Sequence, residues 1–295
     1  MLLKEFPPPT MSHDLLISEA QLAEALLHPK PPLVLDCGFD LTDPAAGQRA
    51  YEAGHIPGAY YVHLEHTLSG PKNGRNGRHP LPSREVFARA IASLGADDET
   101  QVVAYDAAGG MYAARLWWML RWAGHRAAAV LDGGLSAWRA AGRPVVTDLP
   151  PERPAGSFSL RPPLVSTTDY LAVKAAISNL DKLVLDARAP DRFRGENETL
   201  DPIGGHIPGA RNRLFRDNLA PDGRFKPAAQ LRQEFDAITA GRPASQIISQ
   251  CGSGVTACHN LLAMEIAELE GATLYPGSWS EWCAQPCAPI ATGAA

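Results

Sequence analysis

The chain has 295 residues, about twice the usual length of a single domain, which predicts two domains with separate cores. Its 45% apolar and 20% charged residues are typical of a globular protein, and no apolar run approaches the roughly 20 residues that cross a bilayer. A formal net charge of -5 and a pI near 6.0 give no general attraction for nucleic acid or anionic lipid, so we expect neither as a partner. An anionic substrate would have to be held by local groups.

The N-terminus and the cysteines indicate a reducing compartment. Residues 1–6 are followed by three prolines and lack a long apolar core and a small-residue cleavage site, so no secretory signal is expected and the predicted location is cytoplasmic. The five cysteines are an odd and sparse set for this length, which argues against a disulfide framework. Cys283 and Cys287 have no second Cys or His pair at a zinc-like spacing, so we expect no metal and no other cofactor.

The two halves of the chain repeat each other. The motif LVLD at 33–36 recurs at 183–186, and GHIPGA at 54–59 recurs at 205–210. Further along, QVVAY at 101–105 corresponds to QIISQ at 246–250, and LDGGLSAW at 131–138 corresponds to YPGSWSEW at 275–282. Four matches in the same order indicate two homologous domains. Each half alternates short β-branched strands with amphipathic helices, which predicts an α/β fold with a small parallel sheet per domain and helices on both faces.

Glycines and prolines set the predicted boundaries. Helices of the first half are expected near 83–94, 112–123 and 135–141; the residue just past each helix is a glycine, which suits a left-handed helix end: Gly95, Gly124 and Gly142. The proline-rich stretch 143–163 has little apolar periodicity and is predicted to be an extended linker over the surface. The two domains are therefore predicted to span 12–142 and 164–292.

Two groups of aromatic residues allow a structural and a functional interpretation. Trp117, Trp118 and Trp122 lie on one predicted helix at a spacing that suits packing against a sheet or the other domain, and we interpret them as core. His55 and His206 of the GHIPGA turns invite a catalytic interpretation, but the proline and glycines beside each histidine favour a structural turn.

The clearest chemistry lies at Cys251, which follows a predicted strand at 247–250 and precedes a helix predicted over 255–269. Gly252 and Gly254 can both take a positive φ, so the loop can form a cradle whose backbone N–H groups point at the sulfur, and the helix adds the positive end of its dipole. Such surroundings stabilise a thiolate or a persulfide without a metal. The alternative is that Cys251 is a small buried hydrophobe, as free cysteines most often are.

The first half supplies a comparison for this loop. After its strand at 102–105 stands Asp106, followed by AAGGM. A carboxylate cannot attack sulfur as a thiolate does, so the first domain is predicted to be catalytically silent. The chain is then expected to hold one active site, with Cys251 as its nucleophile.

The paired GHIPGA turns, the LDGGLSAW segment and the Cys251 loop resemble the tandem rhodanese-type sulfurtransferases over residues 15–290. The loop 251–256 resembles that of 3-mercaptopyruvate sulfurtransferases, whereas thiosulfate-preferring members tend to carry basic residues there. The resemblance implies a ping-pong cycle in which Cys251 takes sulfur from 3-mercaptopyruvate or thiosulfate, releases pyruvate or sulfite, and holds the sulfur as a persulfide. A thiol acceptor such as thioredoxin or glutathione, or cyanide, then removes it.

The same resemblance assigns roles to further residues. Arg192 matches an arginine that grips the donor's carboxylate or sulfonate, with an exposed ion pair as the alternative. Ser253 matches a serine that relays a proton to the departing enolate, and His79 and Glu65 match first-domain residues across the interdomain cleft. The remaining predicted substrate-binding residues are Arg188, Gly252, Gly254, Val255 and Thr256.

Two departures from the family pattern bear on the donor. Glu65 stands where an aspartate is common, and residues 196–202 lack the second substrate-binding arginine of animal mercaptopyruvate enzymes, for which the nearby Arg188 and Arg194 could substitute. Thiosulfate sulfurtransferase is therefore the alternative function. A phosphatase on the same fold would need an arginine six positions after the nucleophile, where Ala257 stands. A non-catalytic binding or regulatory module would be expected to lose the cysteine from both halves.

Overall fold

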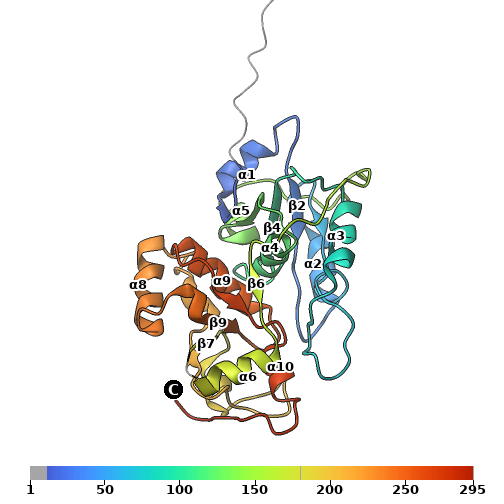
Figure 1. Ribbon diagram of the computed structural model, residues 1–295. Helices are drawn as coiled ribbons and strands as arrows, with labels where there is room; N and C mark the ends of the chain where they lie inside the picture. Colours follow the sequence, from blue (N-terminus) through green and yellow to red (C-terminus); the bar gives the residue numbers. More distant parts are fainter. Residues whose placement is uncertain (1–11, 180, 295) are drawn as a thin grey trace, which may run out of the picture.

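The computed structural model describes residues 12–179 and 181–294. The segment on which we base the expected absence of a secretory signal lies outside these residues. Figure 1 shows two lobes, coloured blue to green and yellow to red along the chain. The elements of each lobe lie within the segments 12–142 and 164–292 that the sequence predicts.

Each lobe contains a five-stranded parallel sheet, and the two sheets have the same strand order. The first runs β1-β5-β4-β2-β3 and the second β6-β10-β9-β7-β8. The first-sheet strands are β1 (Leu16–Ile17), β2 (Leu33–Asp36), β3 (Tyr60–Tyr61), β4 (Val102–Tyr105) and β5 (Ala128–Leu131). The second-sheet strands are β6 (Ser166–Thr167), β7 (Leu183–Asp186), β8 (Arg211–Asn212), β9 (Ile247–Gln250) and β10 (Thr273–Leu274). The repeat inferred from sequence motifs is thus a repeat of topology, and the predicted α/β class is confirmed.

Helices cover both faces of each sheet. In the first domain they are α1 (Glu19–Ala25), α2 (Ala46–Ala53), α3 (Arg84–Ser93), α4 (Ala113–Trp122) and α5 (Gly134–Ala140). In the second domain they are α6 (Tyr170–Asn179), α7 (Pro190–Arg194), α8 (Ala228–Thr239), α9 (Thr256–Ile266) and α10 (Ser278–Trp282), with short 3-10 turns at Phe215–Asn218 and Ala244–Gln246. The three predicted first-half helices are observed within one or two residues, and Gly95, Gly124 and Gly142 all have a positive φ.

Alternation along the strands explains why both faces are covered. In β2, Leu33 and Leu35 belong to a core that includes residues of α3 and α4, whereas Val34 belongs to a second core that includes Leu22 of α1 and Trp138 of α5. Successive side chains of a strand point to opposite faces, so a strand buried on both sides must be apolar throughout.

The two domains share one core where α4 packs against α9. Trp117 and Trp118 of α4 are fully buried, and Trp122 is partly buried against the same core, as expected for a packing role. The interaction is reciprocal: Arg115 of α4 donates to the carbonyl of Gly254, and His259 of α9 lies 3.0 Å from the carbonyl of Gly109. Each helix therefore touches the loop that precedes its counterpart in the other domain.

The linker and the GHIPGA turns have structural roles. Residues 143–163 contain no helix and run along the first domain, where Gly156 and Arg161 donate to the carbonyls of Ala92 and Ala123. The Nδ1 atoms of His55 and His206 lie 2.8 and 2.9 Å from carbonyls of the same domain, and both rings stack on a neighbouring aromatic ring. These contacts support the interpretation of both histidines as parts of structural turns.

Candidate active site

Cys251 follows the last residue of β9, at the carboxyl end of the second sheet, and lies at the wall of a cavity of about 340 Å³. The cavity collects side chains from both domains. Of the predicted site residues it is lined by Cys251, Gly252, Ser253, Val255, Thr256, Arg188 and Arg192. Apolar residues complete the wall, among them Met111 and Tyr112 of the first domain and Leu214 and Phe215 of the second. The site therefore has the mixed apolar and polar lining of a small-molecule pocket.

The two glycines of the loop serve different purposes. Gly254 has a φ of +77°, and a Cβ there would lie 2.3 Å from the carbonyl oxygen of Pro276, so only glycine fits. Gly252 does not have a positive φ, contrary to our expectation for both glycines. A Cβ at Gly252 would instead approach Nη2 of Arg78 to 2.7 Å, so its missing side chain leaves room for a guanidinium. Gly254 does not line the cavity, and it contributes the shape of the loop.

The repeated YPGSWSEW segment anchors the cysteine. The N–H of Cys251 donates to Oγ of Ser278 at 3.1 Å, and the carbonyls of Cys251 and Gly252 accept from the N–H groups of Trp279 and Ser280. Ser278 has a φ of +55° and is itself held by the carbonyl of Tyr275. The backbone of Cys251 is thus fixed by the first turn of α10, which explains why this motif recurs in the sequence.

The equivalent loop of the first domain holds an anion. The carboxylate of Asp106 is fully buried and accepts four backbone hydrogen bonds of 2.7 to 3.0 Å, from the N–H groups of Ala108, Gly110, Tyr112 and Ala113. A carboxylate can be buried without a cation when several amides point at it. This loop is therefore an anion cradle, and in the second domain Cys251 stands at the corresponding place, in a shorter loop (251–255 against 106–112).

Ser253 and His79 meet across the domain boundary. Oγ of Ser253 lies 2.8 Å from Nδ1 of His79, and Nε2 of His79 lies 3.9 Å from Oε1 of Glu65. Glu65 is closer to Lys72, at 2.6 Å, and this contact lowers the pKa of Glu65. Burial, with Arg115, Arg78 and Lys72 nearby, lowers the pKa of His79 to about 3, so the imidazole is neutral at physiological pH.

Arg115 is a buried cation behind the cysteine loop. Its guanidinium is fully buried and donates to the carbonyls of Gly254, Leu68 and His79 at 3.0 to 3.2 Å. Within the described ranges no carboxylate forms an ion pair with it. Burial lowers the pKa of Arg115, and the nearby thiols of Cys258 and Cys251 oppose that shift. Arg115 thus ties the Cys251 loop to the segment that carries His79.

The arginines of the second domain are engaged by acidic residues. Arg188 is buried, forms a bidentate pair with Asp186, and lies over the ring of Trp279, so few of its donors are left for a substrate. Arg192 is partly exposed at the cavity and pairs with Glu198 at 2.8 Å and Asp201 at 3.3 Å. The sequence did not point to Arg78, which enters the cavity from the first domain, although it immediately precedes the predicted His79.

Comparison with known proteins agrees with this geometry. The family model described as "Rhodanese-like domain" matches residues 19–141 and 170–285. The chain belongs to the rhodanese-like family. A probable 3-mercaptopyruvate sulfurtransferase of Pseudomonas aeruginosa is 47% identical over 285 residues, covering 96% of this chain and all of the relative. The bovine thiosulfate sulfurtransferase is 34% identical over 284 residues, covering 90% of this chain and 91% of the relative.

The solved structure of SseA from Escherichia coli, described with the fold and mechanism of 3-mercaptopyruvate sulfotransferases, superposes on the rhodanese-like chain with a TM-score of 0.77. It is 30% identical, and the match covers 90% of this chain and 99% of SseA. Family membership and these relatives make the chain an enzyme with two tandem rhodanese-like domains.

Three further thiols of this rhodanese-like chain are buried, at Cys37, Cys258 and Cys283. Burial raises the pKa of Cys258 to about 12 and that of Cys283 to about 11, and it also raises the pKa of Cys37. A thiol whose pKa is raised in this way is not ionised at neutral pH and is a poor nucleophile. The raised pKa values of Cys37, Cys258 and Cys283 therefore disfavour these three thiols as nucleophiles.

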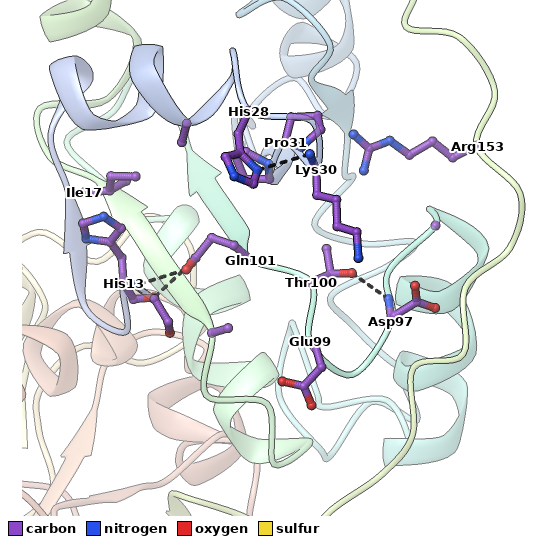
Figure 2. Close-up of a pocket in the computed structure, with 15 residues that line it drawn as sticks. His13, Ile17, His28, Lys30, Pro31, Asp97, Glu99, Thr100, Gln101 and Arg153 are labelled. Atoms are coloured by element: carbon purple, nitrogen blue, oxygen red, sulfur yellow. Dashed lines mark hydrogen bonds between the residues drawn. The ribbon is translucent and has the colours of Figure 1, made fainter. Parts of the chain in front are cut away.

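A larger cavity of about 620 Å³ lies elsewhere on the rhodanese-like chain (Figure 2). Its lining includes His13, Gln101 and Ala127. Gln101 and Ala127 immediately precede β4 and β5, so the cavity lies at the amino ends of these strands, whereas the Asp106 loop lies at the carboxyl end of β4. Ligands of open α/β sheets bind outside the carboxyl ends of the strands, so this cavity is not the expected active site. Within residues 12–179 and 181–294, no group of His, Cys, Asp or Glu suits a metal ion. No helix in these ranges is long and apolar enough to cross a membrane.

Proposed function

We propose that this protein transfers sulfur from 3-mercaptopyruvate to a thiol acceptor or cyanide through a persulfide on Cys251. The observation that carries the proposal is the convergence of Cys251, Ser253 and Arg192 at one cavity between two domains, with His79 of the first domain 2.8 Å from Ser253. Each group matches one need of the reaction: a nucleophile, a proton relay and an anion ligand.

The surroundings of Cys251 suit an anionic sulfur. The sister loop holds the Asp106 carboxylate with four amides, and we infer that the shorter Cys251 loop, which also joins a strand to a helix, favours a thiolate or persulfide in a related way. Arg115 adds a full positive charge behind the loop, in a setting where water does not screen it. Both effects favour Cys251 as the sulfur carrier.

The proposed first half-reaction conserves atoms and charge. The Cys251 thiolate forms a bond to the donor's sulfur, the carbon–sulfur bond breaks, and its electron pair goes to the departing enolate. The proton lost by the donor's thiol is the proton that the enolate carbon needs to become pyruvate. Neutral His79 can accept a hydrogen bond from Ser253 at Nδ1 while its Nε2–H faces Glu65, so the pair can move that proton within the site. In the second half-reaction the acceptor attacks the outer sulfur and releases Cys251.

Thiosulfate is the second candidate donor. The loop 251–256 contains no Lys or Arg, which is the sequence argument for 3-mercaptopyruvate. Folding nevertheless brings Arg78 and Arg192 next to Gly252, so cations absent from the loop's own sequence reach it from other elements. This arrangement, together with the similarity to thiosulfate sulfurtransferases, favours thiosulfate as an alternative donor.

The test is a comparison of the two donors on the same protein. After brief treatment with 3-mercaptopyruvate, intact-mass measurement should show one added sulfur that maps to the Cys251 peptide, and Cys251→Ser should show none. We expect the wild-type enzyme to have the higher kcat/KM with 3-mercaptopyruvate, with cyanide, glutathione and thioredoxin compared as acceptors. Turnover retained by Cys251→Ser would overturn the persulfide mechanism. A tenfold or greater preference for thiosulfate would replace the proposed donor.

A further inference from the structure

Arg78 lies at the centre of a contact between the two domains. Its N–H donates to Oγ of Ser280 at 3.0 Å, and the preceding Gly77 has a φ of +86° in a position where a Cβ would lie 2.7 Å from the carbonyl of Gly277. The segment 77–78 of the first domain is therefore docked on the turn that anchors the cysteine loop. This docking fixes where the Arg78 side chain enters the cavity.

Two guanidinium groups converge above the residue that follows Cys251. A Cβ placed on Gly252 would lie 2.7 Å from Nη2 of Arg78, and 3.6 and 3.7 Å from the two terminal nitrogens of Arg192. Arg78 comes from the first domain and Arg192 from α7 of the second. Two like charges this close need an anion between them.

Asp201 supplies that anion. One of its carboxylate oxygens pairs with Nη1 of Arg78 and the other lies 3.3 Å from Nη2 of Arg192. The Asp201 side chain is only 3% exposed and does not line the cavity, so the carboxylate is buried beside the two arginines. The position between the arginines therefore already binds a carboxylate, next to the nucleophile's loop.

Within the ion-pair cluster at this position the charges cancel. The linked cluster contains three arginines and three carboxylates: Arg78, Arg188, Arg192, Asp186, Glu198 and Asp201. Arg188 is held by Asp186, and Arg192 keeps Glu198 as a partner through its Nε. Asp201 is the carboxylate whose two oxygens face the two converging arginines. A donor anion gains little from a neutral cluster unless Asp201 gives up its place.

We propose that Arg78 and Arg192 form a clamp for the anionic group of the sulfur donor, and that Asp201 is an internal counter-ion which the donor displaces. This inference rests on the proposed function of the Cys251 site. Arg78 takes the place of the second arginine that residues 196–202 lack, and it does so from the other domain. Asp201 then sets the preference between donors, because its negative charge repels a dianion such as thiosulfate more strongly than it repels a monocarboxylate.

The direct test measures KM and kcat for both donors in Arg78→Ala and Asp201→Asn. Arg78→Ala should raise KM by about tenfold or more while kcat changes little, the pattern for loss of binding shared by ground state and transition state. Asp201→Asn should lower KM, by about threefold for 3-mercaptopyruvate and about tenfold for thiosulfate, because Coulomb energy scales with the charge of the ligand. Arg75→Ala is the matched control, since it removes a cation from the same first-domain segment but does not line the cavity.

A binding measurement separates this inference from the proposed reaction. Thiosulfate should raise the melting temperature of Cys251→Ser, the rise should be larger in Cys251→Ser/Asp201→Asn, and it should be absent in Cys251→Ser/Arg78→Ala. If wild type turns over neither donor but these shifts are seen, the reaction is wrong and the clamp stands. If wild type turns over and Arg78→Ala matches Arg75→Ala in KM for both donors, the clamp is wrong and the reaction stands. A KM for thiosulfate that Asp201→Asn leaves unchanged would refute the counter-ion role.

Discussion

Replacing Arg115 by methionine would test whether the first domain supports catalysis from behind the cysteine loop. Methionine keeps much of the side chain's length and so leaves little cavity, but it removes the charge and every hydrogen bond to the carbonyls of Gly254, Leu68 and His79. Two of these carbonyls belong to residues that shape or form the site. The substitution therefore removes one link between Gly254 and His79 without altering any group that lines the cavity.

The expected magnitude follows from two opposing effects. Hydrogen bonds from a charged donor contribute about 1.5 to 3 kcal/mol each, so three of them set an upper range of roughly 5 to 9 kcal/mol. Removing a buried charge that lacks a carboxylate partner returns several kcal/mol of desolvation energy. We expect a net fall of about 2 to 4 kcal/mol in the free energy of unfolding. Persulfide formation should slow by about a hundredfold, because the thiolate loses a nearby cation and the loop loses an anchor.

Urea unfolding measures the first effect, and single-turnover intact-mass measurement of persulfide formation measures the second. Arg121→Met is the matched control: Arg121 is also buried on α4, but it pairs with Glu265 at 2.8 Å and does not contact the loop. It should lose stability and keep the rate of persulfide formation. Arg115→Lys should recover part of that rate, since it restores the charge. Arg115→Met with the wild-type rate would refute the role assigned to this cation.

Three further predictions concern His79, the loop glycines and Arg192. Because burial holds the pKa of His79 near 3 while an unfolded histidine titrates near 6.5, its contribution to stability is complete above pH 6.5 and falls as the pH drops, by about 2 kcal/mol at pH 5. The free energy of unfolding, measured with urea at pH 7.5 and 5.0, should differ less between the two pH values in His79→Gln than in the wild type. An unchanged difference would contradict the low pKa assigned to His79. Gly254→Ala should lower the melting temperature and abolish turnover, whereas Gly252→Ala, whose Cβ would meet only side-chain nitrogens of Arg78 and Arg192, should still fold; a Gly254→Ala protein with the wild-type melting temperature would rule out the steric argument. Arg192→Ala should cost about 2 to 4 kcal/mol of transition-state stabilisation with 3-mercaptopyruvate, measured as kcat/KM, and a loss below threefold would argue against an anion-binding role.

Much of the fold could be predicted from the sequence because the information is local. Alternation of strands and helices, glycines just past helix ends, and four repeated motifs predict two α/β domains, and the structure contains two parallel sheets with the same strand order. The position of Cys251 between a strand and a helix also follows from neighbouring residues alone. The correspondence between Cys251 and Asp106 follows from the repeated motifs alone.

Tertiary structure decided which groups surround the cysteine. Arg78 and Arg115 are distant from Cys251 in sequence, and they reach its loop only because α4 packs on α9 and residues 77–78 dock on the second domain. The same docking brings Arg78 to Asp201. Local sequence also could not tell that Gly254 alone takes a positive φ, since both loop glycines can adopt one and the contact with Pro276 selects between them. Residue types near Cys251 thus suffice to predict a nucleophile there, whereas the charges around it arise from long-range packing, which the local sequence pattern does not report.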